Sequence, residues 1–242
     1  MSDAVARLPG PSSALLTLGA LVAGFYVAAQ LAQQVVFHFV LPDAPDAAAE
    51  IARRLLLSDR VRQGVVLASL FLVPIAYAAL ASARWRFAPG AVIVGLLFGL
   101  LFATLESAYR SIDLLTVGGW AAEFVATTDP VQRDTLLGRF RLWDGAVGAL
   151  YLPLLAAHAL SSAAFAVAVC AGKPDRWDRI LAIALGANAL RGLLRTLQMH
   201  AGIAALGPLN ATLYLPVTLL TYGMLSAWLV RAALKRGSTS GS

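Results

Sequence analysis

Six stretches of this chain are each long and apolar enough to cross a lipid bilayer as a helix. A spanning helix needs about 20 mostly apolar residues. In the bilayer core each backbone N–H and C=O must be hydrogen-bonded within the protein, so such stretches form helices. We expect spans at 13–39, 61–81, 89–111, 144–171, 177–200 and 208–234. The sequence therefore predicts an all-α, polytopic membrane protein built as a six-transmembrane-helix bundle.

The composition excludes several other classes of protein. Hydrophobic residues make up 59% of the chain and charged residues 13%, whereas soluble domains carry roughly 45–50% and about 25%. The one cysteine, Cys170, excludes an intramolecular disulfide. The net charge of +6 fits basic loops on the cytoplasmic side, and no basic stripe with interleaved aromatics indicates a nucleic-acid partner. The expected partner is the lipid bilayer.

The chain reads as one membrane domain over residues 1–236, followed by a flexible tail at 237–242. Two connections between the spans are long, at 42–60 and 112–143. Each contains an amphipathic segment, which we expect to lie at the membrane interface. In the second connection, Asp129 and Pro130 form a helix start signal, and this helix should continue into the span at 144–171.

The basic residues of the short connections predict the orientation. With six spans, the N-terminal segment, the connections near 82–88 and 172–176, and the C-terminal end share one side. Basic residues outnumber acidic ones there, and they are Arg7, Arg84, Arg86, Lys173, Arg176, Arg179, Arg231, Lys235 and Arg236. Because basic short loops stay in the cytoplasm, we expect a multi-pass protein of the cell membrane with both termini cytoplasmic.

Polar residues recur at helical spacing on five of the six spans, and helix 61–81 has no such stripe. The stripes are Tyr26, Gln30, Gln34 and His38; Glu106, Arg110 and Asp113; Asp144, Tyr151 and His158; Asn188, Arg191, Arg195 and Gln198; and Asn210, Tyr214, Thr218 and Thr221. Ionisable residues within a span usually face the interior of the bundle. The stripes predict a buried polar cup that opens to the outer side and is roofed by the two long connections.

The charges in this cup allow a structural and a functional interpretation. Buried ion pairs would join the helices, and in that case Arg191 should pair with Glu106 or Asp144. However, no acid shares the helix face of Arg191 and Arg195, and arginine suits a carboxylate or an anionic headgroup. The predicted ligand-binding residues are Arg191, Arg195, Arg110, Asp144, Gln34, Tyr151, Asn188 and Tyr214. The protein would then bind, sense or carry an amphipathic or anionic small molecule or lipid.

Two other functions fit the same residues. A membrane-embedded enzyme acting on a lipid-like substrate would use Glu106 or His158 as its general base. An accessory subunit of a membrane complex would instead turn its polar stripes outward, towards a partner.

The sequence indicates a cofactor or an oligomer less clearly than it indicates the polar cup. The sequence has no His-x-x-x-His or Cys-x-x-Cys pattern for a metal, so we expect no metal and no cofactor. Axial haem ligation by His158 with His38 or His200 is the alternative, although a hydrogen-bonded core histidine is commoner. Gly95 and Gly99 form a small-residue seam that serves close helix packing, within the bundle or between protomers of an oligomer.

Several short stretches resemble an uncharacterised family of bacterial six-helix integral membrane proteins, described only as a domain of unknown function. The similar stretches are residues 47–51 and 58–60, 105–108, 141–145 and 156–158. The chain departs from the family pattern at Trp143, where the family has His, and at 172–176. The resemblance implies six spans in a bacterial inner membrane and points to Glu106, Asp144 and His158. It implies no activity.

Overall fold

The computed structural model describes residues 11–237, and this part of the chain is helical with no strand. The predicted tail falls largely at 238–242, outside the described residues, and Gly237 is the last residue of a helix. The elements are α2 (Ser13–Val35), η1 (Val36–Val40), α3 (Ala47–Arg53), α4 (Leu57–Arg84), α5 (Pro89–Ile112), η2 (Asp113–Val117), α6 (Gly118–Ala126), α7 (Pro130–Cys170), α8 (Arg176–His200) and α9 (Leu206–Gly237).

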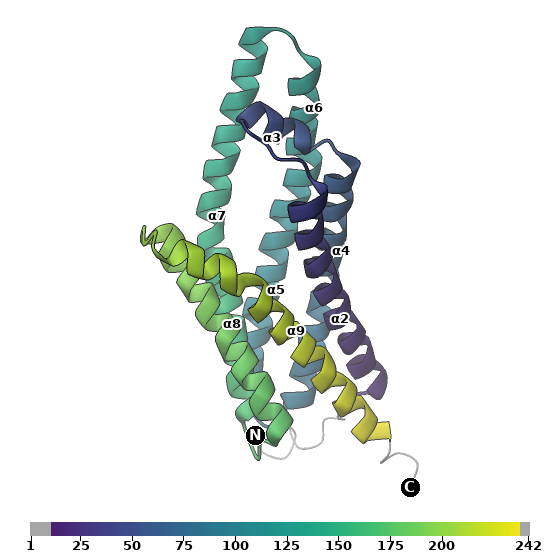
Figure 1. Cartoon of the computed structure of the whole chain (residues 1–242). Helices are drawn as coiled ribbons and strands as arrows, with labels where there is room; N and C mark the ends of the chain where they lie inside the picture. The colour runs from purple at the N-terminus through teal and green to yellow at the C-terminus, as the bar shows by residue number, and fades with distance from the viewer. Residues whose placement is uncertain (1–10, 238–242) are drawn as a thin grey trace.

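Six of these helical segments are long and apolar enough to span a membrane, which confirms the predicted six-helix bundle. They form a ring in which α2, α4, α5, α7, α8 and α9 each pack against their neighbours in sequence, and α9 closes the ring against α2. Because the number of spans is even, α2 begins and α9 ends at the same end of the bundle (Figure 1). We call this the terminal end, and the other the hairpin end.

The outer surface of the ring is apolar, as a surface in contact with lipid must be. Large hydrophobic side chains are exposed along the spans, among them Leu21 at 67%, Val167 at 63% and Ile183 at 70%. A soluble monomer rarely exposes contiguous apolar area on this scale. The structure is therefore that of a multi-pass membrane protein.

At the hairpin end, α6 and α7 rise well beyond the rest of the bundle (Figure 1). The 41 residues of α7 correspond to about 62 Å at ~1.5 Å per residue, twice the ~30 Å hydrocarbon core. The predicted start at Asp129 and Pro130 is confirmed, since the Asp129 carboxylate caps the helix. The helix that starts at Pro130 in the second connection is therefore the first third of α7 itself and forms no separate helix.

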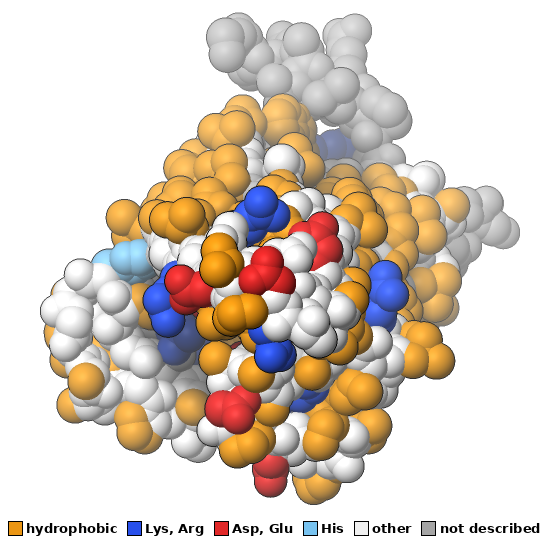
Figure 2. Space-filling model, turned by 90° about the horizontal axis from the view of Figure 1, so that it is seen from above, with side chains coloured by type: hydrophobic (Ala, Val, Ile, Leu, Met, Phe, Trp, Pro, Cys, Tyr) orange, Lys and Arg blue, Asp and Glu red, His pale blue; other side chains and the backbone are white. Residues whose placement is uncertain are grey.

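This projecting hairpin has a small apolar core of its own. Ile51 of α3 packs there with residues of η2, α6 and α7, namely Val117, Ala121, Phe124, Leu136 and Phe140. Arg54, just after α3, donates to Asp113 at 2.7 Å, and Trp143 donates to the same carboxylate oxygen. Figure 2 looks down on this end and shows acidic and basic side chains intermixed above apolar flanks.

The Gly95 and Gly99 seam is filled within the chain. A Cβ on Gly95 would lie 3.0 Å from the Phe165 ring, and one on Gly99 would lie 2.8 Å from the Tyr77 ring. Ser161 of α7 also donates to the Gly95 carbonyl at 2.8 Å. The seam therefore joins α5 to α4 and α7, and it is not available for the contact with a second copy that the sequence left open.

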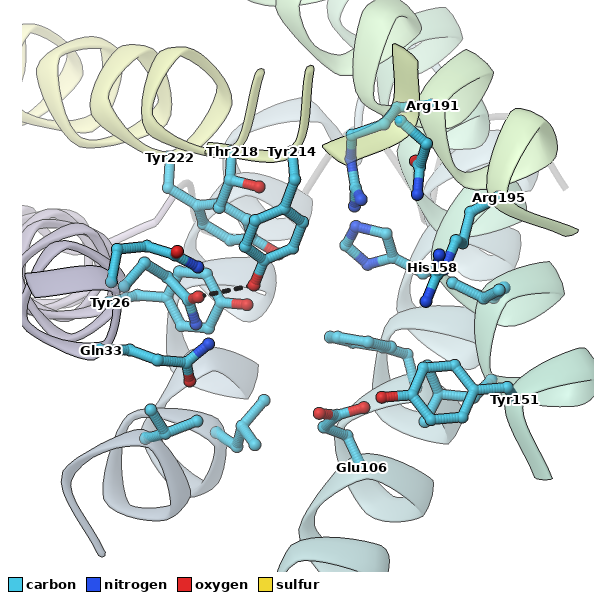
Figure 3. Close-up of a pocket in the computed structure, with 18 of the residues that line it drawn as sticks. Tyr26, Gln33, Glu106, Tyr151, His158, Arg191, Arg195, Tyr214, Thr218 and Tyr222 are labelled. Carbon is cyan, nitrogen blue, oxygen red and sulfur yellow. Dashed lines mark hydrogen bonds between the residues drawn. The ribbon is translucent and has the colours of Figure 1, made fainter. Parts of the chain in front are cut away.

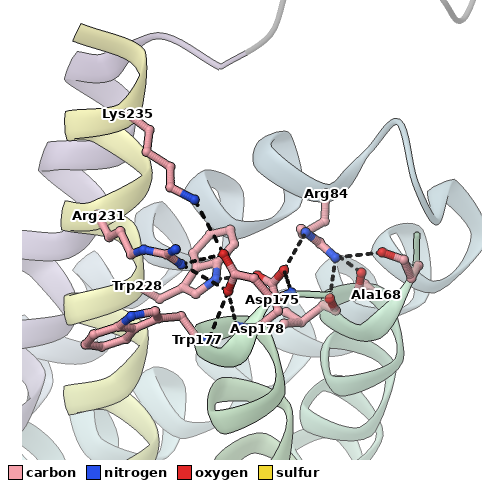
Figure 4. A network of polar contacts seen from close by, with 10 residues as sticks. Arg84, Ala168, Asp175, Trp177, Asp178, Trp228, Arg231 and Lys235 are labelled. Carbon is pink, nitrogen blue, oxygen red and sulfur yellow. Dashed lines mark hydrogen bonds and ion pairs between the residues drawn. The ribbon is translucent and has the colours of Figure 1, made fainter. Parts of the chain in front are cut away.

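A polar network ties the helices together at the terminal end (Figure 4). Arg84 of α4 donates to backbone carbonyls at the end of α7, including that of Ala168 at 3.0 Å, and lies 3.7 Å from the Asp178 carboxylate of α8. Trp228 of α9 donates to Asp178 at 2.7 Å. The Asp175 carboxylate caps α8 and pairs with Arg231 of α9 at 2.7 Å. This network holds the terminal end of the ring closed.

Candidate functional site

A cavity of about 520 Å³ lies inside the ring. All six spans contribute to its wall, as expected for a ring of helices with no helix at its centre. Its lining residues are Tyr26, Gln30, Gln33, Gln34, Phe37, His38, Val66, Leu70, Phe102, Glu106, Arg110, Tyr151, Leu154, Leu155, His158, Arg191, Arg195, Asn210, Ala211, Tyr214, Thr218 and Tyr222. Figure 3 shows many of these side chains facing one another across the space.

The cavity opens where α2 and α9 separate. The two helices are joined by hydrogen bonds from Ser226 to the Ala20 carbonyl and, higher up, from Tyr214 to Gln30 at 2.7 Å. Beyond that point α9 runs towards α8 and away from the upper part of α2 (Figure 1). The lining residues Phe37 and His38 are exposed there. The open side of the cavity therefore lies beside η1, at the hairpin end of the first span.

The predicted roof over the cup is not observed. No residue of α3, and none between 112 and 143, lines the cavity within the described chain. The reason is that these segments pack on one another in the projecting hairpin. Asp144 is exposed and lies outside the cavity, because it stands 14 residues before His158 on the same helix, about 21 Å higher. Its prediction as a ligand-binding residue is corrected.

Glu106 and Arg110 form an ion pair within α5. The Arg110 Nε lies 2.9 Å from a Glu106 carboxylate oxygen, and both residues line the cavity. This is the local i,i+4 pair that the spacing favours. The pair is neutral as a unit, so it neither offers a free base nor leaves a net charge in the cavity.

Arg191 lies buried in the cavity wall without a carboxylate partner. Arg191 is only 7% exposed. None of the ion pairs among the described residues includes it. Its contacts are the Asn188 amide oxygen at 3.4 Å and the Tyr214 ring, whose centroid lies 5.1 Å from its Cζ. The prediction that Arg191 pairs with Glu106 or Asp144 is wrong, because Glu106 pairs within its own helix and Asp144 lies too high.

Arg195 lies one helical turn above Arg191 and also lines the cavity. It donates to the Gln198 amide oxygen at 2.9 Å, and Asn210 donates to the same oxygen at 3.3 Å. Among the described residues it has no ion pair either. Two arginines without acidic partners thus face one space.

His158 reaches the cavity from the middle of α7 and is 4% exposed. Its Nε2 lies 2.8 Å from the Asn188 amide nitrogen, which also donates to Ser162 at 3.0 Å. Its Nδ1 has no hydrogen-bond partner in the described part of the chain. The Nε2 atom is therefore engaged by Asn188, so a general base or a haem ligand at this position would have to use Nδ1.

The predicted roles of the titratable residues stay predictions, but their placement is known. His38 bonds Gln34 at the open side of the cavity, and His200 is exposed and does not line the cavity. No cluster of His, Cys, Asp or Glu suited to a metal ion occurs within residues 11–237. The polar stripes face the interior of the ring, which is opposite to the arrangement that an accessory subunit would need.

The structure brings together most of the predicted ligand-binding residues. Gln34, Arg110, Tyr151, Arg191, Arg195 and Tyr214 line the cavity, as do the catalytic candidates Glu106 and His158. Asn188 stands directly behind the wall, where it contacts both His158 and Arg191.

Several further residues line the cavity beyond the predicted ligand-binding residues. Tyr26 and Gln30 belong to the polar stripe of the first span, so the helical spacing already indicates them. Gln33 lies one position off that stripe. Val66 and Leu70 give the cavity an apolar wall on α4. The sequence does not indicate them, because an apolar residue that lines a cavity looks the same in a sequence as one that faces lipid.

No protein-family model, no curated protein and no solved structure matches this chain. The resemblance to a bacterial six-helix family therefore stays a prediction, and the function is argued from the cavity.

Proposed function

We propose that this protein binds an anionic amphipathic molecule in the cavity of its helix ring, as a carrier or receptor. The observation that carries the proposal is Arg191, a buried cation in the cavity wall that no described acid neutralises. An isolated charge in a protein interior costs several kcal/mol. A ligand anion in the cavity would remove that cost.

The charge balance of the lining supports an anion over a cation. Glu106 and Arg110 cancel each other, while Arg191 and Arg195 leave the wall with an excess of two positive charges in the absence of further acids. Arginine presents a planar fork of donors that matches carboxylate and phosphate oxygens. An ammonium ligand would meet repulsion at the same position.

The rest of the lining supports an apolar body attached to that anion. Val66, Leu70, Phe102, Leu154 and Leu155 form a hydrophobic wall, and binding sites combine such walls with a few placed polar groups. The open side of the cavity lies beside the exposed Phe37 and His38 of η1, at the end of an apolar span. An acyl chain would extend through this open side into the bilayer while the acidic head stays beside the arginines.

We further propose that the protein lies in the cell membrane with both termini cytoplasmic. The excess of Lys and Arg in the short connections of the terminal end supports this orientation, and the cavity would then open in the outer half of the bilayer.

The test is binding of dodecyl phosphate to the protein purified in a mild nonionic detergent, measured by calorimetry, with dodecanol as the uncharged control. We expect Arg191→Gln and Arg195→Gln each to weaken binding of dodecyl phosphate by roughly 10- to 150-fold, because a hydrogen bond to a charged group contributes about 1.5–3 kcal/mol. The matched variant Lys173→Gln removes an exposed cation at the terminal end and should bind as the wild type does. Equal affinity for dodecanol, or no effect of either arginine, would refute the proposal.

A further inference from the structure

We infer that the floor of the cavity is an oxyanion site in which neutral His158 donates its Nδ1–H to the ligand's carboxylate or phosphate, beside the Arg191 guanidinium. This inference rests on the proposed function and deepens it, since it names the ligand group and the donor that recognises it.

The argument begins with the orientation of the Asn188 amide. Arg191 carries only donors, so the Asn188 atom that faces its Nε and Nη2 at 3.4 Å must be the oxygen Oδ1. The Asn188 nitrogen therefore points the other way, towards His158 and Ser162, and donates to both. Arg191 thus fixes an amide that could otherwise be turned over.

The orientation of Asn188 in turn fixes the proton on His158. Because Asn188 donates to Nε2, that nitrogen must be the acceptor, and a neutral imidazole then carries its proton on Nδ1. A doubly protonated ring would set an N–H against the Asn188 N–H groups. The contact at 2.8 Å therefore selects the neutral ring with Nδ1–H.

This Nδ1–H is a buried donor that the described chain leaves without a partner. His158 is 4% exposed and lines the cavity, so a ligand that enters the cavity is the partner we assign to this donor. Figure 3 shows the imidazole and the Arg191 side chain projecting into the same region. The ring itself is held against Phe102, with centroids 4.3 Å apart.

The combination selects one class of ligand group. An unpaired guanidinium and an N–H donor both require an acceptor, and the positive charge favours an anion. A carboxylate or a phosphate oxygen meets both requirements, whereas an ammonium group, which carries only donors and a positive charge, would meet neither. Asn188 contacts the Arg191 guanidinium and the Nε2 of His158 from behind and is thus a positioning residue for the site.

Two variants of His158 separate a donor at Nδ1 from a merely space-filling ring. The amide nitrogen of an asparagine at this position can stand close to the place of Nδ1, whereas that of a glutamine reaches the place of Nε2. We expect His158→Asn to bind dodecyl phosphate within about threefold of the wild type, and His158→Gln to bind it roughly 10- to 150-fold more weakly. Equal binding by His158→Gln and the wild type would overturn the inference.

A spectroscopic readout tests the tautomer without any ligand. Nitrogen NMR of histidine-labelled protein should show His158 as the Nδ1–H form, with its signals assigned by their loss in His158→Asn. In Asn188→Asp, the new carboxylate should accept from Nε2 and move the proton there. An Nε2–H form in the wild type would refute the inference even if dodecyl phosphate binds.

The probes also distinguish the source of the oxyanion. Inorganic phosphate and decanoate are titrated beside dodecyl phosphate against the same variants. Loss of binding in His158→Gln for the alkyl probes alone supports the site and assigns it to a lipid, whereas the same loss for inorganic phosphate supports the site and assigns it to a soluble anion. If the wild type binds none of the probes, both the proposed function and the oxyanion site fail; if it binds but ignores His158, only the oxyanion site fails.

Discussion

Arg84 provides the sharpest test of how the terminal end of the ring is held closed. Its guanidinium donates to the carbonyls of Ala168, Val169 and Ala171 and lies 3.7 Å from the Asp178 carboxylate. Arg84→Met keeps an unbranched side chain that fills much of the same space, but it removes the charge and all donors. Breaking a buried ion pair from one side costs about 3–5 kcal/mol, because the other charge stays uncompensated. We expect the free energy of unfolding to fall by that amount.

The measurement is a titration with SDS of the protein in a mild detergent, followed by tryptophan emission. Trp228 is a local reporter, since it donates to Asp178 at 2.7 Å. Lys173→Gln, an exposed change at the same end, should shift the unfolding free energy by less than about 0.5 kcal/mol.

A second change isolates the charge. Adding Asp178→Asn to Arg84→Met should recover about 1–3 kcal/mol, because no buried carboxylate is then left alone. The reasoning is refuted if Arg84→Met is as stable as Lys173→Gln, or if the second change only adds to the loss.

Two further predictions concern acid stability and orientation. Slight burial raises the pKa of Asp175, but hydrogen bonds from the Asp178 backbone N–H and the Arg231 guanidinium lower it from 3.8 to about 2. A carboxylate whose pKa is lowered in the folded state stabilises the fold at pH values above its unfolded pKa, and this stabilisation is lost as the pH falls towards the folded pKa. SDS titrations between about pH 4 and 2 should therefore show a steeper loss of unfolding free energy in the wild type than in Asp175→Asn. Parallel curves would contradict this. In a cysteine-free background on intact cells, an impermeant thiol reagent should label Ala126→Cys but not Lys173→Cys, and the reverse pattern would invert the orientation.

The spans and the lining of the cavity were largely predictable because both signals are local. A run of apolar residues identifies a span without knowledge of its neighbours. The helical period then places Gln34, Glu106, His158 and Arg191 on inward faces, since polar groups are costly towards lipid. Each of these four residues lines the cavity.

The partners of the charges could not be predicted in the same way. Two residues on different helices meet only if their heights and rotations agree, and the sequence of either helix does not contain that information. For this reason the sequence wrongly favours a pair of Arg191 with Glu106 or Asp144, and it gives no sign of the link from Arg84 to Asp178. The height of Asp144 depends on how far α7 projects, which is set by packing against α3 and α6.

The sequence by itself determined that this chain makes six apolar helices with polar stripes, since propensity, hydropathy and helical period act over a few turns. Only the tertiary structure decided that the helices close into a ring around a cavity. It also decided that no described acid of another helix pairs with Arg191 and that Asn188 of α8 meets His158 of α7, which assigns the proton of His158. These properties depend on contacts between α7, α8 and α9, because the hydrogen-bonding state of a buried group is set by the atoms that other helices bring to it.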